Sequence, residues 1–130
     1  GNLSALPEGF ETIELGRITE ESKMAEIYAA VDMFVIPSEQ DNLPNTVIES
    51  LSTGTPVTGF TVGGIPDMVE APELGHLAPR IDAGELATAM EKMLQTDFDR
   101  EYIRANAVRR YSPHVQAKAY HGLFADMLKR

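Results

Sequence analysis

The sequence has no cysteine and no long apolar run. Disulfides, thiol nucleophiles and thiolate metal ligands are therefore excluded. No stretch reaches the roughly 20 consecutive apolar residues that a membrane-spanning helix needs. The length of 130 residues suits one domain with a single core. From these features we expect one globular domain, with the cytoplasm as its default compartment.

Positive charge is also scarce, since the chain carries a net charge of −9. Residues 1–99 hold 4 basic and 18 acidic side chains, whereas residues 100–130 hold 7 basic and 2 acidic ones. A protein this acidic repels nucleic acid overall, so we expect no nucleic-acid partner. The basic end is expected to form a solvated or self-paired helical face, with contact to an anionic surface as the alternative.

Several catalytic signatures are missing as well. The chain has no Walker A sequence, no nucleophile-elbow serine and no complete dinucleotide fingerprint. Its histidines, His76, His114 and His121, lack the spacing of metal ligands, and we assign no metal. Asp97 and Asp99 fall between two expected helices, where Asp99 is best explained as a helix cap.

Hydrophobic periodicity predicts strands that alternate with helices. The expected strands cover residues 12–15, 33–36, 57–60 and 75–79. The expected helices cover residues 20–32, 45–53, 67–70, 99–110 and 113–129, together with one that Asp82 caps and that reaches at least to Leu94. This alternation is typical of an α/β fold with a doubly wound parallel sheet, whose ligands bind beyond the carboxyl ends of the strands.

Apolar spacing also predicts which helical side chains face the core. The first helix has an expected cap in Thr19-Glu20-Glu21-Ser22 and an apolar face at Met24, Ile27, Tyr28 and Val31. In the helix that follows Asp82, the expected face is Leu86, Met90, Met93 and Leu94.

One stretch, PSEQDNLPNTVIE at residues 37–49, follows the expected strand at 33–36 and leads into a helix. It brings Asp41 to the ligand edge of the sheet, beside the free N–H groups and positive dipole of the helix that starts at Asn45. Glu49 lies one turn further on and shares a helix face with Asn45 and Thr46. A carboxylate there suits a vicinal diol. Turn chemistry with an ordinary helical glutamate is the alternative on spacing alone.

These residues carry a resemblance to a known family. PSEQDNLPNTVIESLSTGTPVTGF and VGGIPDMVE resemble the donor-site motif of the C-terminal domain of GT-B glycosyltransferases, in the retaining family 4, also called group 1. GHLAP, DAGELATAMEKML and YSPHVQAKAYHGLF resemble its last strand and helices. The likeness runs from about Glu11 to the C-terminus and implies a Rossmann-like fold.

The resemblance also implies roles for individual residues. The family's two acidic residues, separated by seven others, map onto Asp41 and Glu49, with Asp in place of the usual Glu at the first position. Asp41 is then expected to meet the sugar hydroxyls and Glu49 the ribose diol. The backbone around Asn42, Leu43, Asn45 and Thr46 is expected to meet sugar or phosphate. Pro44 has no N–H to donate.

The resemblance implies that residues 1–130 are the nucleotide-sugar-binding C-terminal part of a longer glycosyltransferase. Family members carry an Arg and a Lys that clamp the donor pyrophosphate upstream of the segment that resembles this chain, and also an N-terminal acceptor domain. The expected reaction is metal-independent sugar transfer, with retention, from a nucleoside diphosphate sugar to a glycan or lipid-linked acceptor.

Further expectations follow for this chain itself. It should be inactive alone, and an unpaired strand at 12–15 would favour self-association. The parent enzyme is expected in the cytoplasm, with attachment to the inner membrane face as an option. A noncatalytic nucleotide-sugar-binding module and a fragment of a GT-B sugar-nucleotide epimerase are the alternatives.

Overall fold

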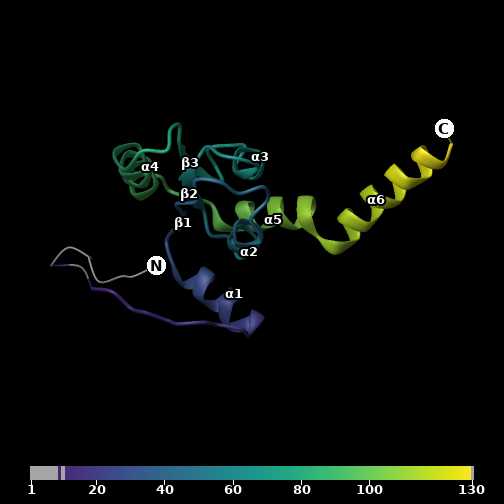
Figure 1. Ribbon diagram of the computed structural model, residues 1–130. Helices are drawn as coiled ribbons and strands as arrows, with labels where there is room; N and C mark the ends of the chain where they lie inside the picture. The colour runs from purple at the N-terminus through teal and green to yellow at the C-terminus, as the bar shows by residue number, and fades with distance from the viewer. Residues whose placement is uncertain (1–8, 10, 130) are drawn as a thin grey trace.

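The computed structural model describes residue 9 and residues 11–129 and shows a parallel sheet flanked by helices (Figure 1). The strands are β1 (Phe34–Ile36), β2 (Val57–Phe60) and β3 (Gly75–Ala78). The helices are α1 (Glu21–Ala30), α2 (Asn45–Ser52), α3 (Ile65–Met68), α4 (Ala83–Gln95), α5 (Arg100–Tyr111) and α6 (Pro113–Leu128).

The sheet has the order β1-β2-β3, and both strand pairs are parallel. Phe34 pairs with Val57, and Val57 pairs with Gly75. Parallel neighbours need a crossover connection, and here these crossovers contain α2 and α3. The expected α/β class with a parallel sheet is therefore confirmed.

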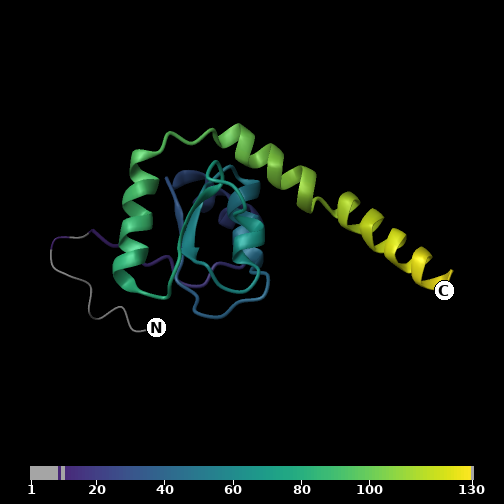
Figure 2. The same ribbon diagram turned by 90° about the horizontal axis from the view of Figure 1, so that it is seen from above.

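Helices cover both faces of the sheet, as alternation along its strands requires. Ile36 and Val57 belong to a core with Val47 and Leu51 of α2 and Ile103 of α5. Phe60 and Ala78 pack instead against Ala89 of α4. Figure 2 shows the strands between α4 on one side and α2 on the other. The sheet is therefore doubly wound.

The expected strand at residues 12–15 is wrong, because residues 11–20 have no regular secondary structure. A strand is held by its ladder to a neighbour, and within the described residues the only sheet is β1-β2-β3. Ile13 and Leu15 consequently remain exposed.

The expected helix faces are right in part. On α1 only Tyr28 is buried, Met24 and Ile27 are half-buried, and Val31 is exposed. The cap expected at 19–22 is right in position, since the cap residue is Glu20 and the first turn holds the acidic Glu21, but the Glu20 side chain accepts no capping hydrogen bond. On α4 Ala89 and Met93 are buried, and Leu94 is 73% exposed.

Two predicted caps are confirmed by their hydrogen bonds. Asp82 accepts from the N–H of Glu85 at 3.0 Å and begins α4. Asp99 accepts from the N–H of Tyr102 at 3.0 Å and begins α5. The short helix α3, expected at 67–70, begins two residues earlier at Ile65, because Pro66 suits the first helical turn.

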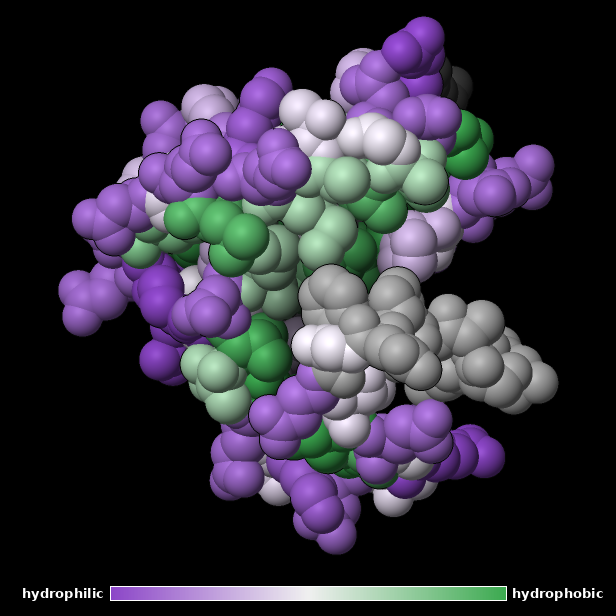
Figure 3. All heavy atoms as spheres, turned by 90° about the vertical axis from the view of Figure 1, so that its left-hand side faces the viewer, coloured by the Kyte–Doolittle hydropathy of each residue, from purple (hydrophilic) through white to green (hydrophobic). Residues whose placement is uncertain are grey.

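The helix α6 extends away from the sheet in both ribbon views (Figures 1 and 2). No residue of α6 is buried, and its contacts in the fold are with α5. Tyr120, Leu123, Phe124 and Met127 are all exposed. No helix in the described residues is long and apolar enough to cross a membrane. Figure 3 shows the opposite, α4 side of the molecule, where polar side chains surround a central strip of apolar surface.

A network of hydrogen bonds attaches α1 to the rest of the fold. The Thr55 hydroxyl donates to the carbonyl oxygen of Tyr28 at 2.6 Å. The Arg100 guanidinium donates to the carbonyl oxygens of Ala29 and Val31 and to the Thr55 hydroxyl, at 2.9, 3.0 and 2.6 Å. These bonds use the carbonyl groups that the end of a helix leaves without partners. The C-terminus of α1 is therefore fixed by residues that lie before β2 and at the start of α5.

Replacing the Thr55 hydroxyl by a methyl group tests this attachment. Thr55→Val keeps the shape of a buried side chain but removes the bond to the Tyr28 carbonyl, which then keeps only the 3.4 Å bond from the Val31 N–H, and leaves one Arg100 N–H without a partner. We expect a loss of about 1–3 kcal/mol in the free energy of unfolding, measured by urea denaturation. Thr61→Val is the control, because the exposed Thr61 hydroxyl, which donates to Ala78, can be replaced by water. Equal stability of the two variants would contradict the assignment.

Candidate functional site

The loop between β1 and α2 brings polar groups to the carboxyl edge of the sheet. Within it Asp41 is half-buried, Asn42 and Leu43 are exposed, and Pro44 is buried at the cap position of α2. The Pro44 carbonyl accepts the N–H of Val47 at 3.0 Å, which starts the helix. The N–H groups of Asn45 and Thr46 lie before the first internal bond of α2, so they remain available to an anion.

A glycine turn after β2 packs directly against this loop. The Gly64 N–H donates to the carbonyl oxygen of Asp41 at 3.4 Å. A Cβ atom on Gly63 would lie 1.6 Å from the same oxygen, and one on Gly64 would lie 2.1 Å from the Asn42 oxygen. Gly63 also has a φ of +53°, which favours glycine. The two glycines therefore set how close the turn comes to Asp41.

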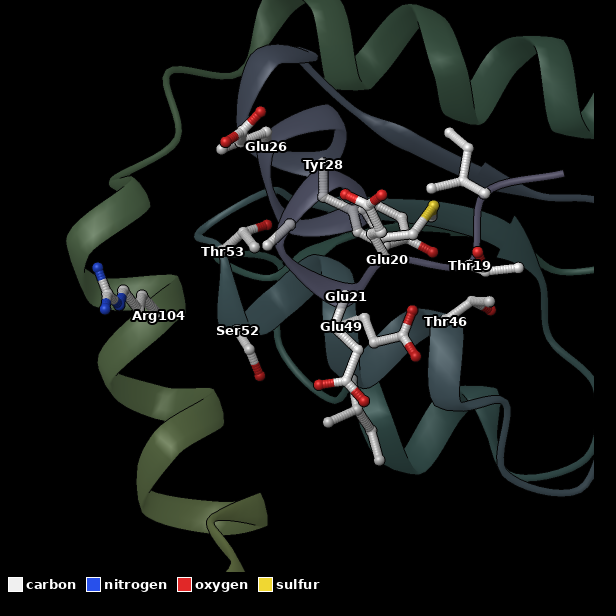
Figure 4. Close-up of a pocket in the computed structure, with 15 residues that line it drawn as sticks. Thr19, Glu20, Glu21, Glu26, Tyr28, Thr46, Glu49, Ser52, Thr53 and Arg104 are labelled. Carbon is white, nitrogen blue, oxygen red and sulfur yellow. The ribbon is translucent and has the colours of Figure 1, made fainter. Parts of the chain in front are cut away.

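A cavity of about 990 Å³ opens between α1 and α2. Its volume falls within the range of small-molecule sites. Figure 4 shows its lining side chains, with Arg104 of α5 at the opposite end from Thr46 in this view. The lining residues are Ile18, Thr19, Glu20, Glu21, Met24, Ala25, Glu26, Tyr28, Ala29, Thr46, Ile48, Glu49, Ser52, Thr53 and Arg104.

Glu49 and Tyr28 are electrostatically coupled within this cavity. The Glu49 side chain is exposed, whereas Tyr28 is 5% exposed and its ring lies edge-on to Phe34 with centroids 5.3 Å apart. Burial raises the pKa of Tyr28 to about 12, and the charge and hydrogen-bonding capacity of the Glu49 carboxylate add to the rise. The phenol of Tyr28 therefore keeps its proton at neutral pH.

The structure brings together part of the predicted set. Thr46 and Glu49 share the cavity, as their common helix face requires. Asp41, Asn42, Leu43 and Asn45 do not line it. Asp41, Asn42 and Leu43 lie on the loop before α2, against which the glycine turn packs, and Asn45 is the first residue of α2. Their ligand contacts remain predictions.

Sequence reasoning missed the wall formed by Ile18–Glu21 and α1. Residues 19–22 are read locally as a cap, and Met24 and Tyr28 as an apolar face. The one available signal is the Tyr28 hydroxyl, because a tyrosine that faces a core usually needs a partner for its O–H group. Its position opposite Glu49 depends on α1 packing against α2, which no local pattern reports.

The basic end of the chain is partly used within the fold, as expected. Arg100 caps α1, and Arg110 donates to the carbonyl oxygens of Asp67 and Met68 and lies 3.3 Å from Glu70. In the described part of the chain, Arg104 is the sole cationic side chain that lines the cavity. The other charged side chains in the lining are the carboxylates of Glu20, Glu21, Glu26 and Glu49.

These features define a class of protein. A doubly wound parallel sheet with a helix N-terminus at its carboxyl edge is typical of α/β proteins whose ligands bind beyond the ends of the strands. The family described as glycosyl transferases group 1 matches residues 3–96, which is more than half of the chain. The chain belongs to this family.

Curated relatives support the assignment. The chain is 30% identical over 100 residues to the sulfoquinovosyl transferase SQD2 of Arabidopsis thaliana, covering 77% of this chain and 19% of that protein. It is 31% identical over 119 residues to a D-inositol 3-phosphate glycosyltransferase of Thermomonospora curvata, covering 84% and 28%. A putative colanic acid biosynthesis glycosyltransferase, WcaL of Escherichia coli, is 34% identical over 74 residues, covering 52% and 18%. The matched chain thus spans less than a third of each relative.

Substituting Gly63 tests the role of the glycine turn. Gly63→Ala puts a methyl group at the Asp41 carbonyl and strains a left-handed backbone. We expect a loss of at least about 2 kcal/mol in the free energy of unfolding, measured by urea denaturation. Gly122→Ala is the matched control, because nothing lies within 4 Å of its added Cβ and alanine favours the helix α6. A Gly63→Ala protein as stable as the control would show that the turn has room to shift.

Proposed function

We propose that this chain is the donor-binding part of a glycosyltransferase that moves a sugar from a nucleoside diphosphate sugar to an acceptor, with retention of configuration. The observation that carries the proposal is the position of Glu49. Its exposed carboxylate lines a cavity of about 990 Å³, one turn behind the N-terminus of α2. The group 1 family supports sugar transfer as the reaction.

In this proposal the cavity receives the nucleoside. The Glu49 carboxylate accepts hydrogen bonds from the two ribose hydroxyls, and Thr46 contributes a hydroxyl on the same face. Apolar groups of Ile18 and Ile48 line the same cavity and can cover a nucleobase. Nucleoside binding at this point directs the diphosphate toward the start of α2.

The loop before α2 then receives the diphosphate and the sugar. The N–H groups of Asn45 and Thr46 and the helix dipole attract the phosphate oxygens. The backbone of Asn42 and Leu43 supplies further donors, and the half-buried Asp41 accepts from sugar hydroxyls. The leaving diphosphate is stabilised by these dipoles together with cationic side chains of the intact enzyme.

We infer that the reaction needs no metal, because the helix dipole and cationic side chains of the intact enzyme can stabilise the leaving diphosphate.

The charges of this chain alone are a poor match for a diphosphate, because Glu20, Glu21 and Glu26 line the cavity that holds Glu49. We therefore expect weak donor binding and no detectable transfer by the 130-residue chain, with an acceptor-binding domain and further cations supplied by a longer enzyme. A glycan or lipid-linked molecule is the acceptor in this scheme.

The variant Glu49→Gln tests the assigned role in the intact enzyme. It keeps the size of the side chain but removes the charge that strengthens both hydrogen bonds to the ribose. We expect nucleoside diphosphate binding to weaken by roughly 1.5–3 kcal/mol, with an unchanged melting temperature because Glu49 is exposed. Calorimetric titration with uridine, guanosine and adenosine diphosphate measures the affinity.

The control removes one negative charge elsewhere. Glu91→Gln changes an exposed residue of α4, on the opposite face of the sheet from α2, and should leave affinity unchanged. A Glu49→Gln enzyme with full affinity and a lowered melting temperature would make Glu49 a structural residue and overturn its role in binding.

A further inference from the structure

The ring of Tyr28 is held in place by packing, and its hydroxyl group can donate a hydrogen bond. Its ring is 5% exposed and lies edge-on to Phe34, at an interplanar angle of 89°. Its backbone carbonyl is held by Thr55 at 2.6 Å, and Arg100 holds the neighbouring carbonyl of Ala29. The position of the phenol oxygen is therefore set by the folded chain and does not depend on a ligand.

Glu49 has the opposite character. It is an exposed side chain on α2, and a free glutamate loses rotamer entropy when one conformation is imposed on it. Other carboxylates line the same cavity, among them Glu20 and Glu21, and these repel it. A ligand that needs Glu49 in one orientation must overcome both costs unless the protein orients it in advance.

The Tyr28 and Glu49 side chains line the same cavity. One lies on α1 and the other on α2, and these helices pack against each other (Figure 4). The Glu49 carboxylate is close enough to contribute to the raised pKa of Tyr28, after the larger effect of burial. At neutral pH the phenol can donate its proton in a hydrogen bond, and the carboxylate can only accept.

We propose that Tyr28 is a positioning residue whose hydroxyl holds one side of the Glu49 carboxylate, so that the remaining acceptor sites face a ribose diol. This inference rests on the proposed function of Glu49. A carboxylate has about four lone-pair sites, so one bond from the phenol leaves enough acceptors for two hydroxyl groups. Tyr28 itself does not touch the ligand in this arrangement.

The contact between the two residues is tested first, without any ligand. Tyrosine labelled with ¹³C at Cζ reports hydrogen bonding of each phenol at neutral pH, and Tyr28→Phe identifies the Tyr28 signal in the 130-residue chain. We expect the Tyr28 signal to move in Glu49→Gln and to stay in place in Glu91→Gln. An unmoved signal in Glu49→Gln overturns the inference.

The functional role is tested by a double-mutant cycle in the intact enzyme. Tyr28→Phe keeps the ring against Phe34 and removes only the hydroxyl. We expect it to weaken binding of the nucleoside diphosphate roughly three- to tenfold, with no further loss when Glu49 is already Gln. Independent, additive losses would show that the hydroxyl does not act through Glu49 and would overturn the inference.

A nucleotide without the ribose diol separates positioning from a structural effect. Tyr28→Phe should bind the corresponding 2′,3′-dideoxynucleoside diphosphate as tightly as the unmodified enzyme does. Equal losses for both nucleotides would make Tyr28 a structural residue. Full affinity in Tyr28→Phe, with a loss in Glu49→Gln, overturns this inference alone. Full affinity in Glu49→Gln overturns the proposed function as well.

Discussion

The arrangement of the helices around the sheet depends on the hydroxyl group of Thr55, which links three parts of the chain. It donates to Tyr28 at the end of α1 and accepts from Arg100 at the start of α5, while its own residue leads into β2. Every polar group in this network has a partner, which is the condition for a buried network to stabilise a fold. The network fixes the end of α1, the helix that forms one wall of the cavity opposite α2.

Most elements from α1 to α6 could be predicted because their signals are local. Asp82 and Asp99 predict helices because their side chains can cap them, and the continuous apolar run at 33–36 predicts a strand, of which Ile36 is buried. The side of α2 that faces the core was also predictable, since Val47 and Leu51 are buried and Glu49 is exposed. Helical spacing was sufficient to place Thr46 and Glu49 in one cavity.

The failures concern features that depend on distant parts of the chain. Residues 12–15 alternate like a strand, yet a strand also needs a neighbour, and the described structure offers none at that position. The glycine pair at 63 and 64 looks like an ordinary turn until the Asp41 carbonyl is seen to occupy the space of a side chain. Tyr28 is the core residue that its spacing predicts, but its place in the same cavity as Glu49 could not be predicted, because it depends on α1 packing against α2.

The long sequence separation within the Arg100 network has a consequence for synthesis. The bond from Arg100 to Ala29 links residues 71 positions apart. A chain emerges from the ribosome N-terminus first. Apart from Arg104, the residues that line the cavity, from Ile18 to Thr53, are therefore made well before the residue that fixes the end of α1. A nascent chain stalled before Arg100 would carry most of the lining residues without the hydrogen bonds that hold α1 in place.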